Sequence, residues 1–126
     1  SHQSTIGMIE VTISGPRGGR VRIEDEQLIY NYVVEACRQL KIVDADIEVL
    51  LYNKFPKDYD YAIGYCYGDK ESVTIELTKE DDDMYQTLAH EMVHCKQFLE
   101  GRYPSELEAK KLEFGLHEKI TEGIGY

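Results

Sequence analysis

Apolar and polar residues alternate along four stretches of the chain, and this period of two is typical of half-buried β-strands. The stretches are residues 8–14, 47–51, 61–68 and 72–78. In the third stretch, Tyr61–Gly68, bulky side chains share one side of the strand, and Ala, Gly and Cys share the other. A side made of small residues lets a backbone or a substrate come close, although a tyrosine-rich strand that only packs would show the same pattern.

Apolar residues at helical spacing predict three helices around these strands. The first covers residues 25–41, the second follows an N-cap at Thr78 and ends near Gly101, and the third begins at Pro104 and Ser105. We therefore expect an α+β fold. In it, a small mixed, mostly antiparallel sheet packs against the N-terminal helix and the second helix, and a C-terminal helix follows.

The length and charge of the chain limit its architecture and its partners. The 126 residues suit a single domain, residues 1–126, with one core. Residues 1–5 are expected to be disordered or derived from an expression tag, since the leading Ser-His-Gln has no initiator Met. The net charge of -10, with 14 Lys and Arg against 24 Asp and Glu, argues against a nucleic-acid partner.

Hydropathy and cysteine content favour a cytoplasmic location. The sequence has neither an apolar run of about 18 residues nor a basic-then-apolar leader, so we expect no membrane span and no secretory signal. Three cysteines without a CxxC pattern favour a reducing compartment over a disulfide framework. Cys95 follows His94 directly but turns about 100° away from it on a helical wheel. We therefore expect Cys95, like Cys37 and Cys66, to fill core volume.

The sequence HEMVH at residues 90–94 carries the clearest chemical signal. On a helix, His90 and His94 project from one face about a turn apart and can hold one zinc ion, while Glu91 between them stays free to act as a general base. The two histidines fall nearly opposite the apolar stripe of the predicted helix, so they are not core residues. That stripe consists of Met84, Leu88, Met92, Cys95 and Leu99.

A catalytic zinc site needs a further protein ligand, commonly His, Glu or Asp. The longer pattern HExxHxxGxxH is absent, because Gln97 stands where Gly would turn the chain, and the continuing helix should carry Glu100 away from the site. On the last helix, Glu106 shares a charged stripe that looks solvated, whereas Glu108 lies at the edge of the inward stripe. Glu108 could instead complete a capping box with Ser105. We expect Glu108 to be the third ligand, with Glu106 as the alternative.

The HEMVH motif, followed by a glutamate directly before Ala109 on the next helix, resembles the zincin metallopeptidases. The resemblance is to the gluzincin branch and its small prokaryotic and phage-encoded SprT-like members, and it covers roughly residues 72–115. It implies a zincin-like fold, Zn²⁺ as cofactor and Glu108 as third ligand. It also implies an edge strand that receives substrate in extended form, matched by Tyr61–Gly68. A second lobe, a basic DNA-associated tail and a leader are missing.

These observations predict a zinc-dependent peptidase located in the cytoplasm, the host cytoplasm if it is phage-encoded. Zinc would activate a water, and Glu91 would take the proton of that water and pass it to the leaving amine. A polypeptide would bind extended along Tyr61–Gly68. Tyr103, just past the second helix, is a candidate oxyanion donor, with an ordinary surface tyrosine as the alternative. The competing hypotheses are a metal-binding regulatory or interaction module with little turnover, and zinc-dependent hydrolysis of another bond.

Overall fold

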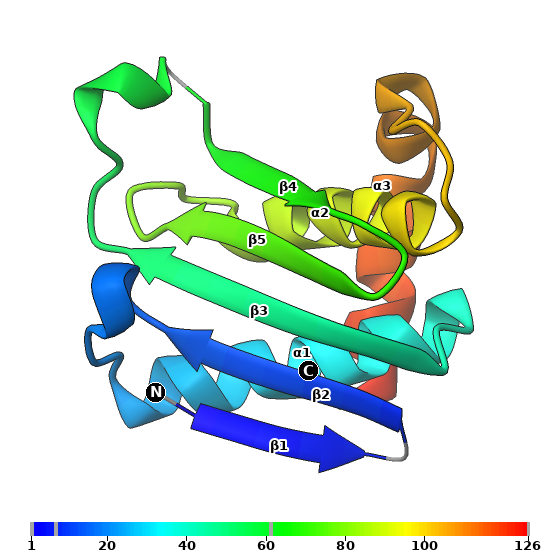
Figure 1. Cartoon of the computed structure of the whole chain (residues 1–126), viewed down its shortest axis with the longest axis horizontal. Coiled ribbons are helices and arrows are strands. Elements are labelled where there is room, and N and C mark those ends of the chain that lie inside the picture. Colours follow the sequence, from blue (N-terminus) through cyan, green and yellow to red (C-terminus); the bar gives the residue numbers. More distant parts are fainter. Residues whose placement is uncertain (1, 7, 61, 126) are drawn as a thin grey trace.

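A five-stranded sheet and three helices make up the described part of the chain (Figure 1). The computed structural model describes residues 8–60 and 62–125, and the backbone of residues 2–6. The strands are β1 (His2–Ile6), β2 (Met8–Ser14), β3 (Asp44–Tyr52), β4 (Gly64–Gly68) and β5 (Ser72–Thr78). The helices are α1 (Ile23–Leu40), α2 (Met84–Leu99) and α3 (Glu106–Gly123), with 3₁₀ turns at Pro16–Gly18 and Lys57–Tyr59.

The sheet is mixed, with strand order β1-β2-β3-β5-β4. Its three central strands, β2, β3 and β5, are parallel, and only the outer strands β1 and β4 run antiparallel to their neighbours. The expectation of a mostly antiparallel sheet was therefore wrong. The alternation of apolar residues reports which side of a strand is buried and carries no information on strand direction, whereas the α1 crossover between β2 and β3 makes these two strands parallel.

Strand β1 lies in the segment that we expected to be disordered or tag-derived. Its backbone pairs with β2 from His2 opposite Ile13 to Ile6 opposite Ile9. The sheet is thus extended by one strand at the edge far from β4 (Figure 1).

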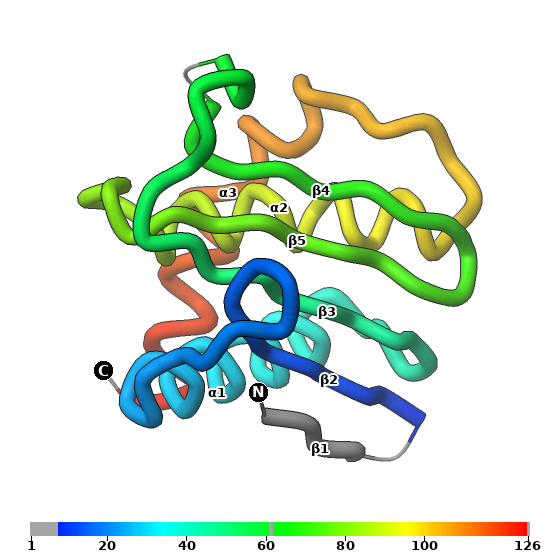
Figure 2. Tube along the Cα trace, turned by 60° about the vertical axis from the view of Figure 1, so that its left-hand side comes forward, coloured from blue at the N-terminus to red at the C-terminus, as the bar shows by residue number. Residues whose placement is uncertain are grey.

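All three helices lie on one side of the sheet (Figures 1 and 2). Helices α1 and α2 form the layer next to the sheet, and α3 forms a second layer on top of them. Helix α1 packs on β2, and α2 packs on β4 and β5, while α3 crosses α1 and α2. The core between the sheet and the helices takes the alternate residues that the sequence pattern indicated, such as Val49 of β3 and Ile75 of β5, together with Leu88 and Met92 of α2. Among the described residues, no helix is both long and apolar enough to cross a membrane.

On the other side of the sheet the described residues form no α-helix, and a tyrosine cluster lies there instead. The buried carboxylate of Glu76 on β5 accepts hydrogen bonds from Tyr59 (2.7 Å) and Tyr67 (2.6 Å). The hydroxyl of Tyr65 donates to the backbone oxygen of Tyr59 at 2.7 Å. These contacts tie the loop between β3 and β4 to the sheet.

Helix α2 begins later than the sequence predicted and ends where it predicted. The sequence prediction placed the start directly after Thr78, but the helix begins at Met84, after the N-cap Asp83. The predicted stop is confirmed, because the helix ends at Leu99 and Gly101 adopts the left-handed conformation (φ +72°) that closes many helices. The chain then turns back, so that the first residue of α3, Glu106, lies against His90 and His94 in the middle of α2.

Candidate metal centre

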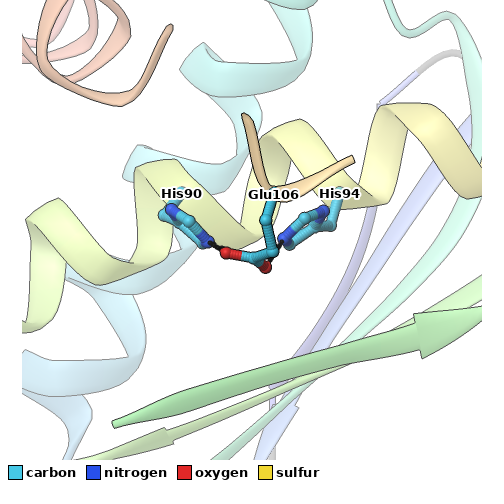
Figure 3. A group of neighbouring side chains, drawn as sticks. All are labelled: His90, His94 and Glu106. Atoms are coloured by element: carbon cyan, nitrogen blue, oxygen red, sulfur yellow. Dashed lines mark hydrogen bonds and ion pairs between the residues drawn. The ribbon is translucent and has the colours of Figure 1, made fainter. Parts of the chain in front are cut away.

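Three side chains from two helices converge on one point (Figure 3). His90 and His94 lie one turn apart on α2, and Glu106 is the first residue of α3. The Nε2 atom of His94 lies 2.6 Å from Oε1 of Glu106, and the Nε2 atom of His90 lies 3.2 Å from its Oε2. The ligand atoms all lie within 4.8 Å of one another, an arrangement that could hold a metal ion.

The second ring nitrogen of each histidine is turned toward another partner. The Nδ1 atom of His94 lies 2.8 Å from Oε1 of Gln97, and Nδ1 of His90 lies 3.5 Å from Oε1 of Glu113, at the outer limit of hydrogen bonding. In metal sites, such outer partners fix the orientation and the tautomer of the ligating ring. Both histidines therefore present Nε2 to the point that they share with Glu106.

The donor set fits a transition metal of borderline softness. Two imidazole nitrogens and one carboxylate are a common set of protein ligands in catalytic zinc sites, which leave the fourth position open. Ligands at about 2.0–2.1 Å from a tetrahedral ion lie about 3.3 Å apart. The measured separation of 3.2 Å between His90 Nε2 and Glu106 Oε2 is close to that value, and the 2.6 Å contact of His94 is shorter.

Glu108, which we expected as the third ligand, lies elsewhere. Its Oε1 accepts hydrogen bonds from Nε2 of Gln97 and Nη2 of Arg102, both at 3.0 Å. Its backbone N–H donates to Oγ of Ser105, which caps α3. Positions 106 and 108 lie about 200° apart around a helix, so only one of them can face the histidines. In this structure the alternative residue, Glu106, occupies that place.

Glu91 lies on α2 with its carboxyl beside Gly64 of the sheet strand β4. Its side chain is buried, and a Cβ atom added to Gly64 of β4 would come within 2.9 Å of its Oε2. Glycine at position 64 therefore lets β4 pass directly beside this carboxyl. No residue that the structure describes donates a hydrogen bond to it. Burial raises the pKa of Glu91 to about 7, although the neighbouring histidines oppose the rise.

A cavity of about 330 Å³ joins Glu91, part of the triad and the start of β4. Its lining includes Lys110, one helical turn after Glu106 on α3. Among the residues that line it, Lys110 is the single permanent cation. The lining consists of Ala62, Ile63, Gly64, Thr87, His90, Glu91, Glu106, Lys110 and Glu113.

Two other described residues singled out in the sequence, Tyr103 and Cys95, do not join the triad. Tyr103 lies in the loop between α2 and α3 with 95% of its surface exposed. Cys95 is buried in the core, where desolvation raises the pKa of its thiol. Tyr61, the first residue of the stretch expected to bind substrate, falls outside the described residues, while Gly64–Gly68 form β4.

Sequence reasoning missed the surroundings of the triad. The helical repeat placed Gln97 on the face of the two histidines but gave it no partner, because periodicity assigns a face and not a contact. The stripe of Glu106, Lys110, Glu113 and His117 was assigned to solvent. Glu106 and Lys110 are exposed, as expected, but together with Glu113 they also line the cavity. His117 contacts the Tyr32 hydroxyl at 2.7 Å.

Comparison of the chain with protein-family models, with curated proteins and with solved structures found no match. The case for a function therefore depends on the residues and geometry of the site. The arrangement that a function has to explain is a triad that could hold a metal ion, next to a buried carboxyl.

Proposed function

We propose that this protein is a zinc-dependent peptidase. One observation carries the proposal: two histidine Nε2 atoms and the Glu106 carboxylate converge beside a buried carboxyl, Glu91, that has no hydrogen-bond donor among the described residues. A purely structural zinc site is closed by four protein ligands, and it has no use for a carboxyl next to it. The combination of three ligands and an adjacent base is typical of metal-assisted hydrolysis.

The proposed chemistry divides between the metal and Glu91. A zinc ion held by His90, His94 and Glu106 would supply Lewis-acid chemistry, lowering the pKa of water and polarising a carbonyl. Glu91 would accept a proton from the attacking water as the water oxygen bonds to the carbonyl carbon. It would then deliver that proton to the amine nitrogen as the carbon–nitrogen bond breaks. The buried position of Glu91 keeps bulk water from competing for the proton.

The substrate would be a polypeptide in extended conformation. β4 is the last strand of the sheet, so one of its edges has no neighbouring strand among the described residues. An extended peptide can add to such an edge through main-chain hydrogen bonds. Gly64 at the start of β4 lies against Glu91 and lines the cavity, which would bring the scissile bond of a peptide on this edge close to the proposed base.

Lys110 would complete the site from the α3 side. Peptide hydrolysis develops negative charge on the carbonyl oxygen, and a donor aimed at that oxygen lowers the barrier. Lys110 lines the cavity together with Glu91 and Glu106. We assign it this role in place of Tyr103, which is almost completely exposed.

The resemblance to zincin metallopeptidases supports the same proposal. It rests on the HEMVH motif and on a glutamate of the following helix, with Glu106 in place of Glu108. An edge strand beside the motif helix is the arrangement that the resemblance implies, and β4 lies against α2 in this way. That the protein is a zincin and that its metal is zinc are both parts of this proposal.

A cleavage assay with metal control tests the proposed function. The metal-free protein is incubated with a chemically unfolded, fluorescently labelled protein, first alone and then with one equivalent of Zn²⁺. We expect cleavage only with zinc, loss of cleavage on adding a chelator, and recovery when zinc is restored. Zinc binding without chelator-sensitive cleavage over a broad panel of unfolded proteins would contradict the proposal and favour a metal-binding interaction module.

A further inference from the structure

Gln97 is a completely buried amide at the centre of the contact between α2 and the start of α3. Its Oε1 atom lies 2.8 Å from Nδ1 of His94 and accepts the backbone N–H of Ser105 at 2.9 Å. Its Nε2 atom donates to the backbone oxygen of Ser105 at 3.2 Å and to Oε1 of Glu108 at 3.0 Å. Every polar position of this side chain is therefore used.

These partners determine which end of the amide faces His94. The backbone N–H of Ser105 can only donate, so the atom opposite it must be the amide oxygen. The backbone oxygen of Ser105 and the carboxylate of Glu108 can only accept, so they must face the amide nitrogen. The oxygen next to His94 in turn requires a proton on Nδ1 of that ring.

The proton on Nδ1 matters for metal binding. A neutral imidazole with its proton on Nδ1 has its lone pair on Nε2. In His94, Nε2 is the atom that lies 2.6 Å from Glu106. Gln97 thus leaves Nε2 of His94 as the ring atom that faces the point where the triad converges, where a bound cation would take its lone pair.

Gln97 also holds the chain segment that carries the third ligand. Its two contacts with Ser105 fix the residue directly before Glu106. Its backbone oxygen accepts the N–H of Arg102 at 2.9 Å, where the chain leaves α2. One side chain therefore connects the ring of His94 with the first turn of α3.

We propose that Gln97 is the positioning residue of the metal site, which holds His94 in its Nδ1–H form and fixes Glu106 opposite it for a divalent cation such as Zn²⁺. The inference rests on the metal-binding part of the proposed function. It does not depend on which bond the protein cleaves.

The test compares Gln97→Met, which keeps the volume and removes the amide, with Gln39→Met on α1. Gln39 donates one hydrogen bond to Glu35, far along the chain from the triad, so its replacement controls for a general loss of an amide. Zinc affinity is measured by competition with a chromophoric chelator. The tautomer of His94 in the metal-free protein is measured by long-range ¹H–¹⁵N NMR correlation.

We expect Gln97→Met to weaken zinc binding by about 10–100-fold, the usual effect of removing an outer partner of a ligating histidine. We also expect the Nδ1–H form of His94 to be lost as the main species, whereas Gln39→Met should change neither quantity. If the parent protein and Gln97→Met bind zinc equally tightly, the role assigned to Gln97 is wrong, whereas the proposed function is unaffected. If the parent protein does not bind zinc, the proposed function fails, and the assignment fails with it.

A second variant covers the case in which Gln97→Met does not fold. In Gln97→Glu combined with Glu108→Gln, the carboxylate at position 97 still accepts from His94 and from the backbone N–H of Ser105, and the new amide at 108 donates to it. The donor to the backbone oxygen of Ser105 is lost in this exchange. We expect the exchange to keep the Nδ1–H form of His94, because the acceptor beside Nδ1 remains. Loss of that form in a folded protein would contradict the positioning role.

Discussion

Two buried carboxyls on opposite sides of the β4–β5 hairpin have contrasting surroundings. Glu76 on the open side of the sheet and Glu91 on the helix side are each only 6% exposed. Burial alone would raise the pKa of Glu76, but hydrogen bonds from Tyr59 and Tyr67 outweigh this and hold it below its ordinary value. Burial raises the pKa of Glu91 to about 7, and no described residue donates to it.

The two carboxyls differ in what their surroundings provide. A buried ionised group destabilises a fold unless donors satisfy it, and Glu76 has two such donors. Glu91 has none among the described residues, and it lines a cavity beside three side chains that could hold a metal ion. The contrast marks Glu76 as a structural carboxylate, and it supports the role proposed for Glu91.

The largest expected effect comes from Glu91→Gln. Removing a general base typically slows a reaction by about 10²–10⁴-fold, and we expect this loss in the zinc-loaded protein. Because the change removes a buried charge to which no described residue donates a hydrogen bond, the melting temperature should not fall. Cleavage rates, zinc content and thermal unfolding provide the three measurements. Full activity in this variant would show that Glu91 is not the general base.

The second prediction concerns the carboxylate of the triad. Glu106→Ala should weaken zinc binding by more than the roughly 10–100-fold expected for an outer partner, since it removes a ligand itself. Glu108→Ala, the matched change two residues along α3, should keep an affinity much closer to that of the parent. The reverse order of the two affinities would restore Glu108 as the third ligand.

The third prediction tests whether the hydrogen-bonded carboxylate of Glu76 stabilises the fold. Glu76→Gln should lower the free energy of unfolding by about 1–3 kcal/mol at pH 7, the range for hydrogen bonds to a charged group. Because the pKa of Glu76 is lowered in the folded state, its contribution is present above the unfolded value and is lost as pH falls through the folded value. The difference between the variant and the parent should therefore shrink in acid. Urea unfolding at several pH values measures it, and a constant difference would contradict this account.

The smallest effect is expected at Lys110. Lys110→Met should reduce the cleavage rate at saturating substrate about tenfold, less than the loss seen for a fixed oxyanion donor, because a lysine side chain is flexible. Lys111→Met, the next residue on α3, removes the same charge outside the cavity lining and serves as the control. Equal activity of both variants would remove Lys110 from the proposed site.

Local patterns in the sequence predicted most elements of the fold but missed β1 and the start of α2. Strands β2 and β5 have the predicted bounds, and α2 stops at the predicted glycine. The direction of the central strands could not be predicted in the same way, since one-sided burial looks alike in parallel and antiparallel pairs. Strand direction follows from the crossovers between strands, which are a property of the whole chain.

The candidate site likewise has a part that the sequence predicted and a part that it did not. The pairing of His90 and His94 follows from the helical repeat, and the sequence predicted it. The choice between Glu106 and Glu108 depends on how α3 is rotated about its axis, and contacts from Gln97 to Ser105 set that rotation. Those contacts cross between two elements, so no periodicity in either helix reveals them.

The edge of β4 that has no neighbouring strand among the described residues has a consequence for the behaviour of the protein at high concentration. Exposed strand edges invite pairing with a second copy, and lysine or proline on the edge strand commonly prevents it. Residues 64–68, GYCYG, contain neither. The net charge of -10 protects this edge by mutual repulsion between copies. Concentrated salt shortens the reach of that repulsion to about 3 Å at 1 M, so salting should favour edge-to-edge aggregation.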